Sequence, residues 1–241
     1  MFPSRRNTHQ RFSNFKTLGL AGSTALMAQI ALPVAIWMGQ KISLTLIGGT
    51  DADFAPPIDI QQNVFAKIVQ NFGIELNIAQ NRRGFFPRGN GEAVYKIEPV
   101  KALKPINLKP VGNISIHACC WFSTRENKGK IEKEIEIAGN VTKSWKHPKI
   151  LEISTEILET KEKAFGTGAG VYLFGKNSDI VCSWTELAKF DRKKNMKGNG
   201  KLLAETAWKR CVEDIGNGLQ FVICKTFLGS YFPGLNTRVI F

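Results

Sequence analysis

The chain has 241 residues, and its apolar content of 43% is sufficient for one large domain or two modest ones with buried cores. Its 33 lysine and arginine residues exceed its 20 acidic residues, and the net charge of +13 suits a polyanionic partner, either nucleic acid or an anionic membrane surface. The 5 cysteines include no C-x-x-C pair, which excludes a metal site of paired cysteines and indicates free, largely buried thiols in a reducing compartment.

The N-terminal part of the chain contains a long uncharged stretch. Residues 1–16 are polar and basic, and they predict a disordered start. Residues 18–38 carry no charge, so their length alone makes them a candidate membrane segment. Because Gly22 and Pro33 interrupt this stretch, we predict a buried core helix over residues 23–38, with a membrane span as the alternative.

The middle and end of the chain alternate between strand and helix patterns. Alternating apolar residues predict a half-buried strand over residues 41–47, and apolar residues at every fourth position predict a helix from Pro57 to Phe72, stopped by Gly73. The other predicted elements are strands over 74–80, 92–97, 113–122, 149–157, 171–174 and 179–184, and helices over 131–145 and 202–215. The alternation predicts an α/β or α+β chain with a boundary near residue 113.

Residues 48–59 form a glycine turn that leads into the helix. Glycines allow a backbone to approach a ligand closely, and a helix N-terminus favours anions, so a nucleotide could bind here. A plain strand-to-helix turn closed by Pro56 and Pro57 explains the same residues. Both interpretations remain open from the sequence.

Residues 81–92 interleave arginines with phenylalanines. Arg82, Arg83 and Arg88 could pair with phosphates while Phe85 or Phe86 stacks on bases. The same pattern is equally compatible with a solvated hairpin loop whose phenylalanines face the core.

Familiar catalytic and nucleotide motifs are missing elsewhere. The glycine-rich segment 165–170 precedes a predicted strand, whereas a dinucleotide-binding loop follows a strand and opens a helix, so we predict a structural turn. His9, His117 and His147 lie in unrelated contexts, and we expect a packed, hydrogen-bonded side chain for His117. No P-loop, G-x-S-x-G or H-E-x-x-H sequence is present.

Taken in order, these segments resemble the RNA 3'-terminal phosphate cyclase family. Residues 21–33 are similar to its A-G-S…Q…P helix, residues 48–59 to its G-G-T…A-P-x-I-D turn, and residues 83–92 to its R-G-Y-Y-P-K-G-G-G-E loop. Residues 164–170 and 204–218 keep the order and spacing of the later family segments.

The resemblance implies a fold of repeated β-α-β-α-β-β units with an inserted smaller domain of thioredoxin-like topology, incomplete in this chain. Residues 17–113 would be part of the large domain, 114–218 the insert, and 219–241 a divergent tail.

The resemblance also implies a function. The family converts RNA 3'-phosphates to 2',3'-cyclic phosphates with ATP, through an adenylated histidine. ATP and a divalent metal such as Mg would be cofactors, with Gln29 and Pro56 on the matching positions of the adenylate pocket. We expect RNA 3' ends as the partner, contacted by Arg82, Arg83 and Arg88, with no DNA specificity, no membrane association and a location in the nucleus.

Several departures from the family pattern bear on activity. The family's early G-G-G-Q-I-L-R segment, which supplies metal and RNA contacts, has no counterpart, and the tail 219–241 contains no histidine. We therefore expect a cyclase-like protein, truncated at both ends and inactive as given, with no catalytic residue to assign. The alternative is a non-catalytic relative that binds RNA or protein in ribosomal RNA processing.

Overall fold

The structure is a computed structural model. It describes residues 15–16, 22–53, 55–100, 102–105, 112–124, 128–159, 164–177, 181–191, 193 and 195–216. The predicted disordered start, apart from residues 15–16, and the predicted divergent tail lie outside the described residues.

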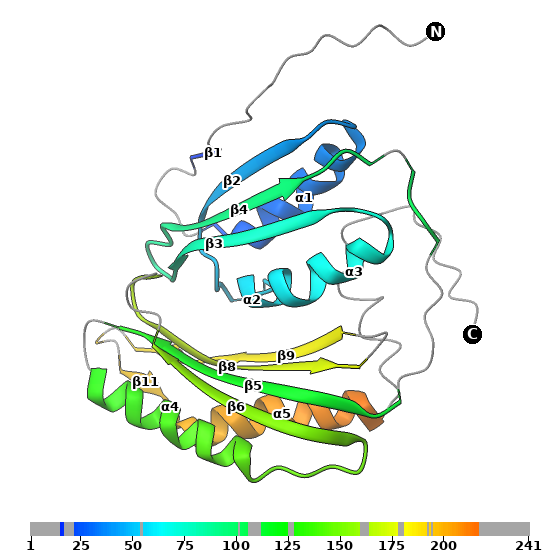
Figure 1. The fold of residues 1–241 in the computed structure, drawn as a ribbon. Helices are drawn as coiled ribbons and strands as arrows, with labels where there is room; N and C mark the ends of the chain where they lie inside the picture. The colour runs from blue at the N-terminus through cyan, green and yellow to red at the C-terminus, as the bar shows by residue number, and fades with distance from the viewer. Residues whose placement is uncertain are drawn as a thin grey trace, which may run out of the picture.

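The first layer is a five-stranded sheet with two helices on one face (Figure 1). Its strands, in spatial order, are β1 (Phe15–Lys16), β2 (Ile42–Gly48), β4 (Gly91–Ile97), β3 (Leu76–Gly84) and β7 (Ala164–Phe165). The helices are α1 (Thr24–Trp37) and a second helix of three parts, α2 (Ile58–Ile60), a π-turn η1 (Gln61–Phe65) and α3 (Ala66–Asn71). From β1 to β4 the order is β-α-β-α-β-β, the order that the resemblance implies for one unit.

The second layer is a four-stranded sheet with two helices on its far side (Figure 1). Its strands, in spatial order, are β6 (Ile150–Glu159), β5 (Ile114–Ser123), β8 (Gly168–Lys176) and β9 (Val181–Leu187). Strands β5 and β6 are parallel and joined by α4 (Lys128–Lys143), while β8 and β9 add antiparallel strands. A small ribbon of β10 (Lys189–Phe190) and β11 (Met196–Lys197) leads into α5 (Gly200–Gly216), which packs beside α4.

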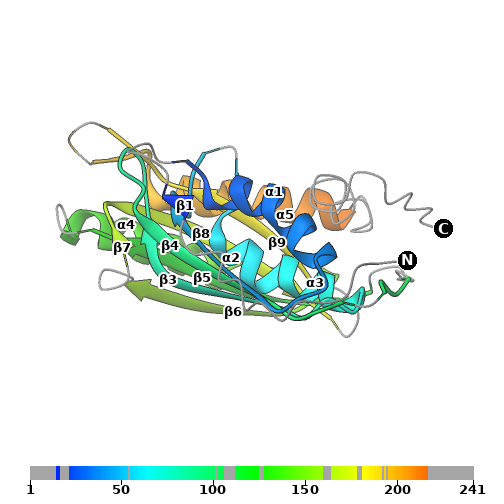
Figure 2. The ribbon, with the colours of Figure 1, turned by 90° about the horizontal axis from the view of Figure 1, so that it is seen from above.

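Helix α2–α3 lies between the two sheets (Figure 1), and the long strands of both sheets run along the same long axis (Figure 2). One hydrophobic core takes its buried members from residues 28–97, and the other takes them from residues 114–215. The predicted α/β class is confirmed. The division at residue 113 and the thioredoxin-like topology stay predictions.

Helix α1 realises the helix predicted over residues 23–38. Ser23 caps its first turn by accepting a hydrogen bond from the Leu26 amide, as a helix N-cap requires. One side, including Leu32 and Ile36, is buried in the first core, while the other leaves large apolar side chains such as Ile30 exposed. Among the helices that the structure describes, none combines the length and the apolarity needed to cross a bilayer.

Two boundaries differ from the prediction. The strand predicted to end at Gln80 continues to Gly84 as β3. A bulge shifts its register with β4 between Gln80 and Arg82, and the pairing resumes at Arg82. Arg82 and Arg83 therefore lie in a strand, and the hairpin loop is confined to residues 85–90. Residues 189–197, for which no strand is predicted from the sequence, form the β10–β11 ribbon, whose apolar residues pack on the second core.

Two isoleucines on α4 test the second core. Ile135 is fully buried and Ile137 is 36% exposed, although both lie on the same helix. We expect Ile135→Ala to lower the free energy of unfolding by about 2–5 kcal/mol, through lost burial and the cavity left behind. The control Ile137→Ala should cost less than about 1 kcal/mol. Urea denaturation measures both, and equal losses would contradict the placement of α4.

Candidate functional site

Backbone hydrogen bonds join the three segments that carry the family resemblance. The Gly49 amide donates to the Gly22 carbonyl (2.8 Å), and the Thr24 amide donates to the Gly49 carbonyl (2.9 Å). The Thr50 amide donates to the Gly84 carbonyl (3.0 Å), and Gly84 donates back to the Thr50 hydroxyl (3.0 Å). The start of α1, the glycine turn and the end of β3 therefore form one connected structure.

The glycines at this junction are required by close backbone approach. A Cβ atom on Gly48 would lie 2.2 Å from the Gly22 carbonyl oxygen. One on Gly84 would lie 2.1 Å from the Gly91 nitrogen, and one on Gly91 would lie 2.7 Å from the Thr50 side chain. No side chain fits at these distances, so the structural interpretation of the turn accounts for these glycines.

Arg83 is a buried charge at the centre of the site. Its side chain points into the interior and is only 5% exposed. One terminal nitrogen donates to Asp51 (3.0 Å) and to Asp59 (2.8 Å), and the other donates to Asp59 (2.6 Å). The guanidinium also lies 4.4 Å from the ring centroid of Trp121, on β5 of the second sheet. Arg83 thus joins the glycine turn, the first turn of α2 and the second sheet.

The charges in this cluster depend on one another. Burial raises the pKa of Asp51, and Arg83 and the hydrogen bond from Thr50 oppose that rise. Burial alone would lower the pKa of Arg83, but Asp51 and Asp59 outweigh it and hold that pKa above its ordinary value. The arginine is therefore permanently charged, and it is the cation that allows two carboxylates to remain in the interior.

The prediction that Arg83 contacts RNA phosphate is wrong for this arrangement, because the guanidinium is buried and committed to two carboxylates. Arg82 is half-buried, and its guanidinium donates to the carbonyl (2.7 Å) and side-chain oxygens of Asn90. Arg88 is exposed in the hairpin loop. Two of the three predicted arginines therefore remain near the surface.

The two phenylalanines of the hairpin have opposite environments. Phe85 is 6% exposed and stacks on Trp121, with 5.8 Å between ring centroids. Phe86 is 85% exposed. The core interpretation is therefore correct for Phe85, and only Phe86 is available to stack on a base.

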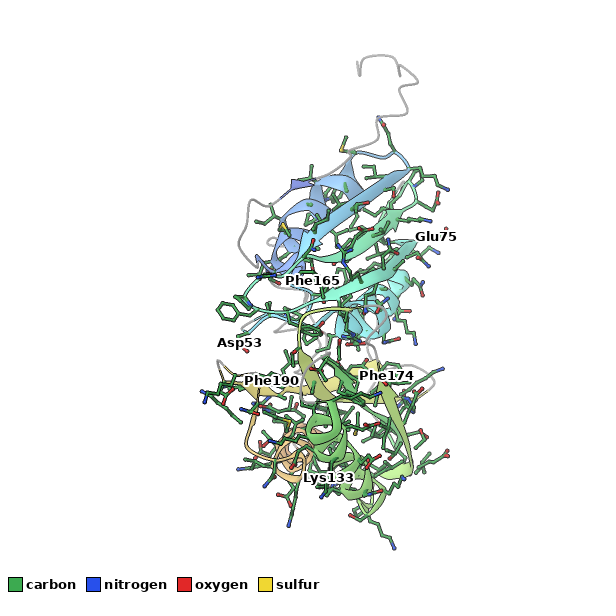
Figure 3. All side chains as sticks on the ribbon, turned by 90° about the vertical axis from the view of Figure 1, so that its left-hand side faces the viewer. Asp53, Glu75, Lys133, Phe165, Phe174 and Phe190 are labelled. Atoms are coloured by element: carbon green, nitrogen blue, oxygen red, sulfur yellow. The ribbon has the colours of Figure 1, made fainter. Side chains whose placement is uncertain are left out.

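The third glycine segment receives the Phe85 ring. A Cβ atom on Gly168 would lie 2.3 Å from that ring, and Gly166 has a φ of +105°, which favours glycine. Strand β7 lies just before these glycines and pairs in parallel with the end of β3. Its residue Phe165, labelled in Figure 3, pairs with Gly84. The segment is a structural turn, as predicted, and it is shaped to hold one aromatic side chain.

Helix α2–α3 contacts the second sheet through Lys67. Lys67, two turns after Asp59, places its ammonium 4.7 Å from the ring centroid of Phe174, which Figure 3 labels between the layers. Burial, and to a lesser extent the nearby Lys176, lowers the pKa of Lys67. This contact therefore pairs a cation of the helix with an aromatic ring of the second sheet.

Comparisons with known proteins agree with this assembly of segments. The family model described as RNA 3'-terminal phosphate cyclase matches residues 3–226. The chain belongs to this family. It is 31% identical to RNA 3'-terminal phosphate cyclase of Drosophila melanogaster over 173 residues, covering 70% of this chain and 47% of that protein.

Archaeal cyclases are also similar. The Staphylothermus marinus cyclase is 30% identical over 224 residues, which is 91% of this chain and 59% of that protein. The Pyrobaculum aerophilum cyclase is 42% identical over 97 residues, which is 40% of this chain and 28% of that protein. The chain thus spans between about a quarter and three fifths of the length of these relatives.

The two predicted adenylate residues lie on elements that meet at the junction. Gln29 is half-buried on α1, and Pro56 is half-buried in the turn before α2, where its carbonyl accepts a hydrogen bond from Gln61 (3.3 Å). The contact of Gln29 and Pro56 with a nucleotide stays a prediction.

The described residues do not fit a divalent metal. No three histidine, cysteine, aspartate or glutamate side chains gather to ligate an ion in the part of the chain that the structure describes. The closest pair of carboxylates at the site, Asp51 and Asp59, already pairs with Arg83. We therefore assign no metal ligand to these residues.

His117 differs in part from the prediction of a packed side chain. It lies on the partly exposed face of β5, with one ring nitrogen 2.9 Å from the Ser154 hydroxyl and the other 3.2 Å from Glu156. Its polar atoms are satisfied, as expected, but 42% of its side chain is exposed.

The residues that sequence reasoning missed are Asp51, Asp59 and Trp121. The available signal was a pair of acidic residues at the two ends of a glycine turn, together with an arginine in the neighbouring motif. Because the sequence does not show that β3 continues through Arg83, it does not connect this arginine with the two acidic residues.

The buried cluster predicts a pH-dependent variant. We expect Arg83→Met to lower the free energy of unfolding at pH 7 by about 3–5 kcal/mol, since it leaves two carboxylates buried without their cation. Burial already raises the pKa of Asp51, and removing the cation that opposes this rise should place it further above its unfolded value. Stability should therefore recover as the pH falls through the folded pKa of Asp51, because the folded state takes up the proton first.

Arg88→Met is the matched control, since it removes an arginine from the same hairpin at an exposed position. We expect it to change stability by less than about 0.5 kcal/mol at any pH. Urea denaturation between pH 4.5 and 7 makes the comparison. Equal effects of the two substitutions, or a pH-independent loss for Arg83→Met, would contradict the cluster.

Proposed function

We propose that this chain is a cyclase-type protein that binds ATP and RNA 3' ends at the junction of α1, the glycine turn and the β3–β4 hairpin. The observation that carries the proposal is the direct hydrogen bonding among the three segments that resemble the family. Gln29 and Pro56 would border the adenylate, and the nucleus is the expected location.

The family reaction indicates which group of the RNA the hairpin would recognise, namely the 3'-phosphate. In that reaction AMP passes from an adenylated histidine to the RNA 3'-phosphate, and the vicinal 2'-hydroxyl then closes the cyclic phosphate and releases AMP. The nucleophile divides a difficult displacement into two easier ones. Of this reaction we propose only the binding of ATP and of the RNA end for this chain, and we assign the nucleophile to none of its residues.

The alternative is a scaffold of ribosomal RNA processing that has no nucleotide pocket. Both functions use RNA, so ATP binding distinguishes them. A protein of the first kind binds ATP through Gln29, whereas one of the second kind binds RNA or protein alone.

ATP binding is the direct test. We expect calorimetry to detect ATP binding to the purified chain, and Gln29→Ala to weaken it about tenfold or more, the effect of losing one hydrogen bond to a charged or polar ligand. Gln40→Ala, an exposed glutamine just after the same helix, is the control. ATP affinity that is absent, or equal in both variants, would refute the adenylate pocket.

The same protein, incubated with labelled ATP and RNA bearing a 3'-phosphate, tests this assignment. We expect no covalent AMP on His117, whose ring nitrogens lie within hydrogen-bond distance of Ser154 and Glu156, or on His147. Covalent AMP that is lost when either histidine is substituted would overturn the assignment.

The hairpin gives a prediction for RNA. Phe86→Ala should weaken binding of a short RNA by on the order of 1–3 kcal/mol through lost stacking, without changing the melting temperature. Phe85→Ala, one residue earlier, should instead lower stability by about 3–5 kcal/mol. Replacing Arg82 and Arg88 together should reduce the slope of log affinity against log salt by about 1.4, for two lost phosphate contacts.

Salt titrations and thermal melts on the three variants make the comparison. An unchanged affinity for Phe86→Ala and an unchanged slope for the double variant would remove the hairpin from the RNA site.

A further inference from the structure

The β10–β11 ribbon presents lysines at one end of the molecule. Lys189 pairs with Lys197, and Phe190 pairs with Met196, in the antiparallel register of the ribbon. Phe190 and Met196 pack on the second core, whereas both lysines are exposed. The alternation of the two strands therefore directs the charged side chains outward.

The pairing of Lys189 with Lys197 is electrostatically unfavourable in the isolated chain. Like charges directly opposite each other on neighbouring strands destabilise a sheet. An anion bound between the two ammonium groups would offset this repulsion. This pair of like charges is a local feature of the ribbon and does not follow from the net charge of the chain.

The acidic side chains beside the ribbon are engaged in holding its shape. Asp191 accepts hydrogen bonds from the amide (2.9 Å) and side chain (3.3 Å) of Asn195, within the turn of the ribbon. Glu134 of α4 accepts from the Gly200 amide (2.7 Å) at the start of α5. These carboxylates fix the turn of the ribbon and its junction with the helices.

A hollow of about 410 Å³ separates the ribbon from the first turns of α4. Lys130, Lys133 and Glu134 line it from the helix, and Asn195, Met196 and Gly198 line it from the ribbon. Lys130 and Lys133 are exposed. Lys130 and Lys133 therefore line the helix side of this hollow, while Lys189 and Lys197 are exposed on the neighbouring ribbon.

This hollow lies at the same end of the molecule as the β3–β4 hairpin. Figure 1 shows β11 and the start of α4 below the hairpin turn, and Figure 3, which faces this end, labels Lys133 and Phe190. The hairpin, which carries Arg82 and Arg88, and the ribbon therefore lie at the same end of the molecule. One polyanionic chain could contact both.

We propose that Lys130, Lys133, Lys189 and Lys197, the ribbon surface, bind phosphates of the RNA strand on the 5' side of the end held at the hairpin. The identity of the polymer rests on the function proposed above. Exposed cations on the ribbon and on the adjoining first turns of α4 suit a linear chain of phosphates, and these contacts read no base sequence.

The test replaces the four lysines together by glutamine. A control variant replaces four exposed lysines outside the ribbon surface, Lys96, Lys104, Lys143 and Lys146. For an RNA of about 20 nucleotides, four lost contacts at about 0.7 each should reduce the salt slope by about 2.8. Between about 50 and 200 mM salt, the parent should then lose about 50-fold more affinity than the variant.

RNA length separates this surface from the hairpin. We expect a trinucleotide ending in a 3'-phosphate to contact the hairpin alone, so its affinity should be the same for parent and variant. Thermal melts establish that both variants are folded. Equal salt slopes for the ribbon variant and its control, or a matching loss for the trinucleotide, would overturn the proposal.

Other outcomes have defined meanings. Absence of ATP binding, with no preference for a 3'-phosphate over a 3'-hydroxyl in the trinucleotide, would refute the proposed function and leave the salt comparison intact. Binding to vesicles of anionic phospholipid that depends on the four lysines, without any effect on the long RNA, would assign the surface to a membrane and refute an RNA role.

Discussion

The ion pairs of Arg83 with Asp51 and Asp59 organise this molecule. A guanidinium buried at 5% exposure requires partners, and the chain supplies two carboxylates from the glycine turn and from the first turn of α2. The face of the guanidinium lies against Trp121 of the second sheet. A single side chain thereby connects the turn, the helix between the layers, the hairpin strand and the second layer.

Close packing around this cluster explains the glycines. Gly48, Gly84 and Gly91 allow three backbone segments to approach within distances that exclude any side chain, and Gly168 makes room for Phe85. Phe85 then stacks on the same tryptophan that Arg83 contacts. The glycine-rich segments, which look like separate ligand loops along the chain, are parts of one packing arrangement.

This rigid interior separates the residues that hold the structure from those that can meet a partner. Burial of Phe85 and Arg83 leaves Phe86 and Arg88 exposed on the hairpin, a consequence of side chains alternating in a strand and its loop. The second layer repeats this division in its ribbon, where Phe190 and Met196 pack inward and the lysines face outward. Cationic and aromatic groups from distant parts of the sequence therefore collect at one end of the molecule.

The sequence by itself determined the order of most elements, the α/β class and the family, because period-two and period-four apolar patterns and short glycine motifs are local properties. It also identified the turn and the hairpin as the segments of interest. The environment of each hairpin side chain was decided only by the tertiary structure. The bulge at Gln80 carries β3 as far as Gly84, and that register turns Arg83 inward. Burial and ion pairing depend on which distant residues lie opposite, and neither Asp51 nor Trp121 is close to Arg83 along the chain.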